Sequence, residues 1–201
     1  IYKGVVKNIV PAVDGIFVDI GIGKNAFLRR KDLLNEKRFP TEGSPILAQV
    51  IKSDTDMKGA LITEKISMFG KYAVTLSGTG YIGVSKKIRQ ESVRKRLKEI
   101  GKEICAEHMG LIIRTAAENA DMDEFRKDIT RLKENWDIIQ KRFRMEKSPT
   151  LLYRESDIIV KALRDYVNKG TEILITDNRK IYERICKLNE SEHTIEPDKI
   201  S

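Results

Sequence analysis

The sequence predicts an α+β protein, because strand patterns and helix patterns fall in different stretches of the chain. Residues 1–64 consist of short apolar runs separated by turn residues at close intervals, which is typical of a small antiparallel barrel. Residues 65–150 combine strand runs with two stretches of helical periodicity, and residues 151–201 alternate strand and helix patterns. We therefore expect three segments, divided near residues 64 and 150.

The first segment is expected to contain five strands. The turn "PAVDG" separates the first two runs, the glycine-rich turn "GIGKN" precedes the third, and "SDTDMKG" separates the last two. Five strands in a partly open barrel follow the plan of the OB-fold, whose sheet face binds oligonucleotides. The expected runs are Tyr2–Val10, Ile16–Ile20, Ala26–Leu28, Ile46–Ile51 and Ala60–Thr63.

The middle segment is expected to contain a hairpin, a strand and two helices. The stretch "KYAVTLSGTGYIGVS" indicates a hairpin about the turn "SGTG". A basic helix should begin near Ile88, the buried run Leu111–Ile113 should form a strand, and a long helix should follow Asp121, which with Glu124 has capping-box spacing. We interpret the apolar stripe of the long helix as core. Its members are Met122, Phe125, Ile129, Leu132, Trp136, Ile139 and Phe143.

The last segment alternates strand and helix patterns, as part of an α/β unit would. A short strand "LLYR" should precede a helix over Ser156–Val167, and a strand "EILITD" should precede a helix from about Arg179. This segment is small for an independent α/β core, so we expect an incomplete piece of a larger unit.

The positive charge of the chain is concentrated in its middle segment. The 201 residues carry 38 lysines and arginines against 30 aspartates and glutamates, a net charge of +8. Residues 65–150 hold 19 of these basic and 12 of these acidic side chains. This asymmetry favours a polyanionic partner, of which nucleic acid is the commonest. A solvated basic surface that maintains solubility is the alternative, and the runs "KKIRQESVRKRLK" and "KRFR" fit both interpretations.

Several classes of protein are disfavoured by the sequence. No apolar run approaches the roughly 20 residues of a transmembrane helix, and there is no basic and apolar leader, so we expect a cytoplasmic protein. Cys105 and Cys186 lack the paired spacing of a metal site or a disulfide framework, and we interpret both as ordinary buried thiols. The sequence begins at Ile1 without an initiator methionine, and we expect it to be a piece of a longer protein.

The stretch "MGLIIRTAAENAD" has an arginine and a threonine side by side where a buried strand run ends. A buried cation without a partner is costly, so Arg114 needs either an internal carboxylate such as Glu118 or an anion from outside. A guanidinium presents fork-shaped donors that match phosphate oxygens, and the Thr115 hydroxyl adds another donor. A terminal phosphate monoester offers more free oxygens than an internal diester. Arg114 and Thr115 are therefore candidate ligands of a terminal phosphate, with an internal ion pair as the alternative.

Two aromatic residues, Phe17 and Phe27, lie on successive strands of the expected barrel. Alternation alone favours core positions for both, since phenylalanine is among the residues most often buried. If they face outward, they form a platform on which the bases of a single strand can stack. Lys58, in the turn "SDTDMKG", suits a phosphate contact and equally suits a solvated turn.

Separated motifs along the chain resemble the ribonuclease E/G family. They are "IYKGVV", "GIFVDIGIGKNAFL", "MKGAL", "GKYAV", "GLIIRTAAE", "LLYRESDIIVKALRDYV" and "EILITD", in the order of the family and over nearly the whole chain. The resemblance implies a bacterial endoribonuclease that cuts single-stranded RNA, prefers 5′-monophosphorylated ends and acts in RNA processing and decay. It also implies an OB-type RNA-binding domain over residues 1–64, a 5′-sensor subdomain over 65–150 and part of an RNase H-like subdomain over 151–201.

The resemblance assigns roles to individual residues. In the family, the glycine of the "GKYAV" motif leaves room for the terminal nucleotide, and its valine contributes a backbone N–H to the phosphate pocket. An arginine and threonine pair grips the 5′ monophosphate, and two aromatic residues of the barrel touch RNA. The matching positions are Phe17, Phe27 and Lys58 for single-stranded RNA, and Arg114, Thr115, Gly70 and Val74 for the 5′ monophosphate.

The catalytic groups of the family match no position in this sequence. The paired aspartates that hold the catalytic magnesium lie beyond Ser201 in the family, and so does the Cys-Pro-x-Cys zinc link that joins protomers. From the resemblance we expect no catalytic residue, no metal ligand and no bound Mg²⁺ within residues 1–201. The Mg²⁺ would belong to the nuclease part of the parent protein, and the parent would be a homo-oligomer.

Two other interpretations compete with a piece of a ribonuclease. One is a stand-alone RNA-binding module, in which the barrel is fused to a basic adaptor without a nuclease. The other is an autonomous enzyme that uses carboxylates such as Asp157, Asp165 and Asp177, although their spacing is not that of a metal site.

Overall fold

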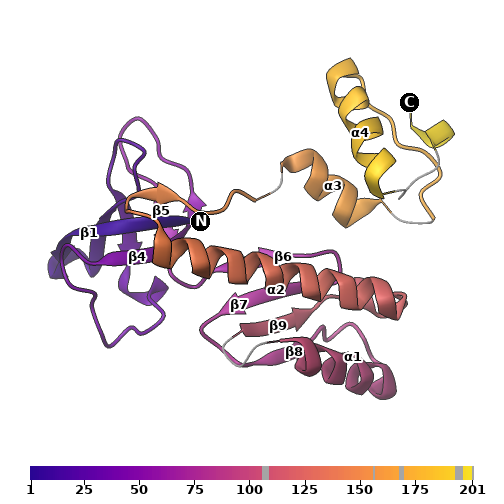
Figure 1. Ribbon diagram of the computed structural model, residues 1–201, viewed down its shortest axis with the longest axis horizontal. Helices are drawn as coiled ribbons and strands as arrows, with labels where there is room; N and C mark the ends of the chain where they lie inside the picture. The colour runs from indigo at the N-terminus through magenta and orange to yellow at the C-terminus, as the bar shows by residue number, and fades with distance from the viewer. Residues whose placement is uncertain (106–108, 156, 168–169, 193–196, 201) are drawn as a thin grey trace. The chain divides into compact units, whose positions relative to one another are not determined.

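The computed structural model divides the chain into two compact units, residues 1–154 and 155–201 (Figure 1). It describes residues 1–105, 109–155, 157–167, 170–192 and 197–200.

The first unit begins with a five-stranded barrel, as the sequence predicts, but the barrel is closed and mixed rather than partly open and antiparallel. Its strands pair in the order β1-β2-β3-β5-β4 and β4 returns to β1; β3 and β5 are parallel, and the other pairs are antiparallel. The strands are β1 (Tyr2–Val10), β2 (Gly15–Asp19), β3 (Ala26–Arg29), β4 (Pro45–Lys52) and β5 (Leu61–Thr63). Alternate side chains fill the interior, and the fully buried ones include Ile16, Val18, Ala26, Leu28, Ala48 and Ile62.

A second, four-stranded sheet follows the barrel, and its order is β6-β7-β9-β8. Its strands are β6 (Ser67–Phe69), β7 (Ala73–Ser77), β8 (Ile82–Val84) and β9 (Met109–Ile113). The helices α1 (Glu91–Ile104) and α2 (Met122–Met145) share the core of this sheet, and Figure 1 shows α2 running along the strands. The expected apolar stripe of α2 packs in this core, with Phe125, Ile129 and Ile139 fully buried.

The predicted hairpin between β7 and β8 is wrong, because β9 lies between these strands and β8 runs parallel to β9. The connecting loop 78–81 passes close to Gly110 on β9. A Cβ atom on Gly110 would lie 2.2 Å from the Thr79 Oγ1 atom, so glycine is required where the loop passes. The hairpin that does form joins β6 to β7, and at its turn the Gly70 N–H donates to the Ala73 carbonyl (2.8 Å).

The ends of the two helices follow local rules. Helix α1 begins at Glu91 rather than near Ile88, and Ile88 itself is buried in the core just before the helix. The Asp121 carboxylate caps α2 by accepting from the N–H groups of Asp123 and Glu124, as predicted.

The start of the chain is fastened to the end of α2. The short strand β10 (Thr150–Leu151) pairs with β1, and the Lys3 ammonium donates to the carbonyls of Phe143 and Glu146, both at 2.7 Å. These carbonyls belong to the last turn of α2 and its C-cap, where a cation is favoured by the helix dipole. The barrel therefore holds the C-terminal end of α2.

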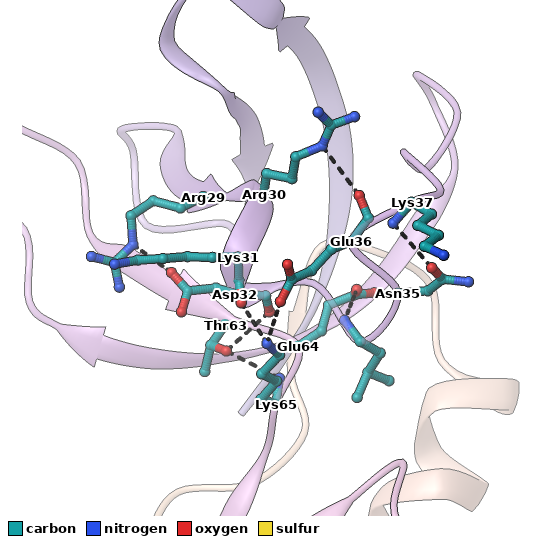
Figure 2. A network of polar contacts seen from close by, with 11 residues as sticks. Arg29, Arg30, Lys31, Asp32, Asn35, Glu36, Lys37, Thr63, Glu64 and Lys65 are labelled. Atoms are coloured by element: carbon teal, nitrogen blue, oxygen red, sulfur yellow. Dashed lines mark hydrogen bonds and ion pairs between the residues drawn. The ribbon is translucent and has the colours of Figure 1, made fainter.

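A polar network links the segment that follows β5 to the segment that follows β3 (Figure 2). The Glu64 carboxylate accepts from the Leu34 N–H (3.0 Å), and the Glu64 N–H donates to the Asp32 carbonyl (2.9 Å). The Lys65 ammonium bonds the Lys31 carbonyl and the Glu36 carboxylate. Burial raises the pKa of Glu64, although the hydrogen bond from Leu34 opposes that shift.

The described residues of the second unit form the α-helices α3 (Ile158–Tyr166) and α4 (Arg179–Glu192), the 3₁₀ turn Pro197–Lys199, and a small core that includes Val167, Ile185 and Ile200. The predicted strand "EILITD" is wrong: of the described residues there, Leu174 alone makes a β-bridge, with Ile200. Ile173 and Ile175 are exposed, so the apolar side chains of this stretch do not pack as those of a strand in a sheet would.

Among the described residues, no helix combines the length and the apolar character that crossing a lipid bilayer requires.

The network of Figure 2 makes the stability of the first unit depend on pH. Because the folded state raises the pKa of Glu64, folding favours its protonated form. That contribution to stability is complete below the unfolded-state pKa and is lost as the pH rises through the folded-state pKa. We therefore expect Glu64→Gln, which keeps an acceptor for Leu34, to raise the melting temperature at pH 7 and to change it little near pH 4. A melting temperature lowered equally at both pH values would contradict this role of Glu64.

Candidate functional site

One edge of the second sheet brings together three segments that are distant in sequence. Strand β9 ends at Ile113, β8 ends at Val84, and the β6–β7 turn lies at the same edge, since the Arg114 N–H donates to the Tyr72 carbonyl and the Ser85 N–H to the Ile113 carbonyl. The predicted residues Arg114, Thr115 and Gly70 therefore meet here. We call this region the sheet edge.

The Arg114 guanidinium is held by backbone carbonyls of the β6–β7 turn. It donates to the carbonyl of Gly70 at 2.8 Å and to that of Lys71 at 3.3 Å, and the side chain is half-buried. Carbonyl oxygens that accept from a guanidinium fix its orientation. These contacts therefore orient Arg114 at the sheet edge.

Two hydroxyls and two exposed lysines lie in the segments that follow β9 and β8. The Thr115 and Ser85 hydroxyls are 2.9 Å apart, and the exposed Lys86 and Lys87 follow Ser85 directly. Arg94 of α1 donates to the carbonyls of Ser85 (2.7 Å) and Ile88 (2.9 Å), which holds this loop against the helix. Ser85 was not singled out by the sequence, because the misassigned hairpin hid its proximity to Thr115, and Lys86 and Arg94 were noted only as members of the basic run "KKIRQESVRKRLK".

Gly70 is required by a buried carboxylate. A Cβ atom at this position would lie 2.3 Å from the Asp128 Oδ2 atom, which accepts a hydrogen bond from the Tyr72 N–H at 2.8 Å. Asp128 is 7% exposed and also accepts from Arg131 (3.0 Å). Packing against Asp128 therefore requires a glycine at this position of "GKYAV", and its expected role in admitting a nucleotide stays a prediction.

The Tyr72 side chain ties the same turn to the start of α2. Its hydroxyl donates to the Glu124 carboxylate at 2.5 Å, and its ring packs edge-on against Phe125. Burial, then the bond to Glu124 and the nearby acidic side chains, raise the pKa of Tyr72. The hydroxyl therefore stays protonated as a donor.

Val74 lies one step inside the sheet edge. It is paired with Phe69 on β6 and with Ile112 on β9, so its backbone groups point at neighbouring strands. Its half-buried side chain lies beside Ile112, which is 40% exposed. Val74 therefore offers this face an apolar side chain, and the expected backbone contact to phosphate stays a prediction.

The two phenylalanines of the barrel lie on its outer face. Phe17 and Phe27 are cross-strand partners whose ring centroids are 5.4 Å apart, and neither is among the buried core residues. A Cβ atom on Gly15 would lie 2.3 Å from the Phe27 ring, so glycine allows this ring to cover the strand. The core alternative for both phenylalanines is therefore wrong.

The paired phenylalanines belong to a row of outward positions that crosses the barrel. The ladder pairs Asn8 with Phe17, Phe17 with Phe27, Phe27 with Leu61 and Leu61 with Lys52. Asn8 and Lys52 at its two ends are exposed. No periodicity of the sequence could have revealed this alignment, since it depends on two register shifts, in β1 and β4.

The predicted Lys58 lies in the exposed loop between β4 and β5. Its carbonyl accepts from the Thr55 N–H (2.8 Å), which closes the loop into a turn. The Lys24 ammonium, from the loop between β2 and β3, donates to the carbonyls of Thr55 (2.9 Å) and Asp56 (2.6 Å). Lys24 therefore tethers the loop that carries Lys58.

Asp157, one of the carboxylates of the autonomous-enzyme interpretation, makes structural contacts. Asp157 caps α3 through the Ile159 N–H and pairs with Arg184 at 3.0 Å; the hydrogen bond from Ile159, then Arg184, lower the pKa of Asp157. Within the part of the chain that the structure describes, no three or more His, Cys, Asp or Glu side chains gather as a metal site would require. Both cysteines are free and half-buried, and burial raises the pKa of the Cys105 thiol.

The chain has two candidate binding surfaces, an aromatic one on the barrel and a cationic one at the sheet edge. Comparisons with known proteins agree on its family. A model of the ribonuclease E/G family matches residues 67–201. Ribonuclease G of Escherichia coli K12 is 33% identical over 204 residues, covering 93% of this chain and 42% of its own length. Ribonuclease E of Synechocystis sp. is 33% identical over 195 residues, covering 92% of this chain and 29% of its own.

A third relative, the putative ribonuclease E of Buchnera aphidicola subsp. Baizongia pistaciae, is 32% identical over 198 residues, with 91% of this chain and 48% of its own length covered. The chain belongs to the ribonuclease E/G family. It spans less than half the length of these three relatives.

The close approach of Asp128 predicts the effect of a single methyl group at Gly70. Gly70→Ala should lower the free energy of unfolding by about 1 to 3 kcal/mol, as other overpacked sites do. The matched control is Gly101→Ala, whose new Cβ would meet the flexible Leu111 side chain at 3.1 Å. Chemical denaturation should show a clearly smaller loss for Gly101→Ala, and equal losses would contradict the account of Gly70.

Proposed function

We propose that residues 1–201 are the RNA-binding region of a ribonuclease of the E/G type, with two contact surfaces for one RNA strand. The outer face of the barrel binds single-stranded RNA, and the sheet edge binds its 5′-terminal monophosphate. The orientation of Arg114 by the Gly70 and Lys71 carbonyls is the observation that carries this proposal.

The donors at the sheet edge suit a terminal phosphate. A dianionic monoester can accept from a guanidinium, a hydroxyl and ammonium groups at once, and these are the groups of Arg114, Thr115 and Lys86. The carbonyl contacts restrain the Arg114 rotamer, so less side-chain entropy is lost when the anion binds. The excess of basic residues between positions 65 and 150 also attracts a polyanion over longer distances.

The outer row of the barrel suits bases without a defined sequence. Half-buried aromatic rings on an outer face can stack on any base, and each such contact is typically worth about 1 to 3 kcal/mol. Phe17 and Phe27 supply the rings, and the lysines at positions 52 and 58 can neutralise phosphates of the same strand.

The hydrolytic step itself is proposed for residues outside this sequence. The ribonuclease E/G resemblance assigns Mg²⁺ to paired aspartates beyond Ser201, and homo-oligomerisation to parts that also lie beyond it. Residues 1–201 would then select and orient the RNA, while the Mg²⁺-dependent nuclease part of the parent protein cuts it.

Arg114 provides the sharpest test of the sheet edge. The isolated chain should prefer a 5′-monophosphorylated oligonucleotide to the same sequence with a 5′ hydroxyl by on the order of tenfold or more at low salt, since a charged hydrogen bond is worth about 1.5 to 3 kcal/mol. Arg114→Gln removes the charge and keeps a donor for the Gly70 carbonyl. This variant should lose the preference and bind the 5′-hydroxyl RNA as the parent does, as measured by fluorescence anisotropy.

Two companion variants separate charge from geometry. Arg114→Lys should restore only part of the preference, because an ammonium lacks the fork. Thr115→Val should cost less than Arg114→Gln. If Arg114→Gln weakens both RNAs equally, Arg114 is a general backbone contact and the terminal-phosphate site fails.

The barrel face is tested by Phe17→Ala and Phe27→Ala. Each should weaken binding of single-stranded RNA by about fivefold or more, because one stacking contact is lost. Each should leave the thermal unfolding transition cooperative, since neither ring belongs to the buried core. The matched control is Phe125→Ala, which removes a fully buried ring and should chiefly destabilise the fold. Unchanged RNA affinity in both surface variants would contradict the barrel assignment.

The division of labour predicts binding without cleavage. Purified residues 1–201 should bind a labelled single strand with an affinity that falls steeply with salt. In a plot of log K against the logarithm of the salt concentration, each neutralised phosphate should add about 0.7 to the downward slope. Added Mg²⁺ should not lead to cleavage. An Mg²⁺-dependent cut that co-purifies with the chain through successive columns would overturn this prediction.

A further inference from the structure

Many of the basic residues of the middle segment lie in one short stretch of the chain. Residues 86–103 contain eight lysines and arginines against three glutamates, and the proposed function places only Lys86 among them in a contact. The stretch consists of the loop that follows β8 and most of α1, which packs against β8 (Figure 1). The direction of the α1 side chains decides whether these cations form one surface.

Helix α1 buries one face and exposes two flanks. Its buried residues include Leu97 and Ile100. One flank faces α2, because the Arg126 guanidinium donates to the Glu103 carboxylate at 3.0 Å. Glu99 lies one turn before Glu103 on the same flank. These two acidic side chains are therefore on the side of α1 that faces α2.

The other flank of α1 carries three lysines. Lys98 and Lys102 follow Arg94 at intervals of four residues, so these side chains share one side of the helix, and Lys95 lies beside them. We call Lys95, Lys98 and Lys102 the lysine row. All three are exposed, and in the part of the chain that the structure describes none of them is in an ion pair. The acidic residue of this flank, Glu91, lies 3.7 Å from the Arg94 guanidinium.

Arg94 connects the lysine row to the loop that follows β8. Its guanidinium donates to the carbonyls of Ser85 at 2.7 Å and Ile88 at 2.9 Å, which holds the loop against the start of α1. Lys86 and Lys87 of this loop are exposed. The loop and the outer flank of α1 therefore form one cationic surface on a fixed backbone.

This surface offers positive charge without stacking. Residues 85–104 include no phenylalanine, tyrosine or tryptophan, whereas surfaces that bind single strands combine cations with aromatic rings. Lysines act as point charges on flexible stems and contact phosphates without reading bases. An RNA duplex keeps its base faces stacked inside and is recognised largely through its shape and its phosphates. The surface is therefore complementary to the backbone of a duplex.

We propose that the lysine row and the adjoining loop bind the phosphate backbone of double-stranded RNA. The rise along a helix separates Lys95 from Lys98 by about 4.5 Å and Lys98 from Lys102 by about 6 Å, so each ammonium can contact a different phosphate. This contact requires neither a particular sequence nor a 5′ phosphate, and it goes beyond the proposed function. The barrel and the sheet edge would bind unpaired nucleotides, while α1 binds a neighbouring stem.

The test uses the full 201-residue chain and a blunt RNA duplex of about 16 base pairs with 5′-hydroxyl ends, which offers neither a terminal phosphate nor an unpaired base. The triple variant Lys95→Gln/Lys98→Gln/Lys102→Gln should weaken binding by on the order of tenfold or more at about 0.1 M salt. It should also reduce the salt dependence of log K by about one unit of slope per lysine. Arginine at the same three positions keeps the charge and should retain the parent affinity.

The matched control removes the same charge elsewhere in the first unit. Lys127→Gln/Lys141→Gln/Lys147→Gln replaces three exposed lysines outside the surface and should change the affinity for the duplex much less. The lysine-row variant should bind single-stranded RNA with a 5′ hydroxyl as the parent does. Both triple variants should melt at the parent temperature, since every replaced side chain is exposed.

The outcomes separate this inference from the proposed function. If the two triple variants lose affinity for the duplex equally, only net charge matters and the inference is overturned. Equal losses on single-stranded and duplex RNA would overturn it as well, because the row would then be a general backbone contact. A parent chain that does not bind the duplex also overturns it, and the surface would then suit an acidic protein. A parent chain that binds the duplex but does not prefer a 5′ monophosphate contradicts the proposed function and leaves this inference standing.

Discussion

The turn Gly70–Tyr72 is held between a cation on one side and an anion on the other, and the sheet edge depends on this constraint. The Arg114 guanidinium donates to the Gly70 and Lys71 carbonyls, while the buried Asp128 carboxylate accepts from the Tyr72 N–H. The two side chains come from β9 and α2, so the turn fixes a strand end relative to a helix. Gly70 permits this arrangement, since any side chain there would displace the carboxylate.

Helix α2 extends the same constraint to the barrel. Asp128 and Glu124, near its start, bind the turn, and its C-terminal carbonyls receive the ammonium of Lys3 on β1. About 22 Å of helix separates Asp128 from Phe143, by the rise per residue. Each of these hydrogen bonds contributes only about 1 kcal/mol to stability, but together they leave α2 little freedom to shift. The two proposed RNA contacts are therefore linked by one helix fixed at both ends.

The sequence predicts most of this architecture where a single strand or helix determines its own pattern. The five barrel strands, the long helix and its Asp121 cap follow from alternation, helical spacing and capping chemistry. The prediction from sequence fails where the order of the strands depends on which strands pair. The loop after Ser77 resembles a hairpin turn, but it passes Gly110, and β8 lies on the far side of β9. Arg114 and Thr115 could be chosen as candidate ligands from their chemistry. The alignment of Asn8 and Lys52 with the two phenylalanines of the barrel could not be predicted, because it depends on register shifts in two strands.

The most direct test of the sheet edge as a terminal-phosphate site is a pair of amide chemical-shift maps. One is recorded with 5′-monophosphorylated RNA and the other with the same RNA bearing a 5′ hydroxyl. The account predicts that the difference between the two maps is confined to residues 69–74, 84–87 and 112–116, while the barrel row through Phe17 and Phe27 shifts equally with both. A difference located on the barrel, or no difference at the sheet edge, would contradict the account.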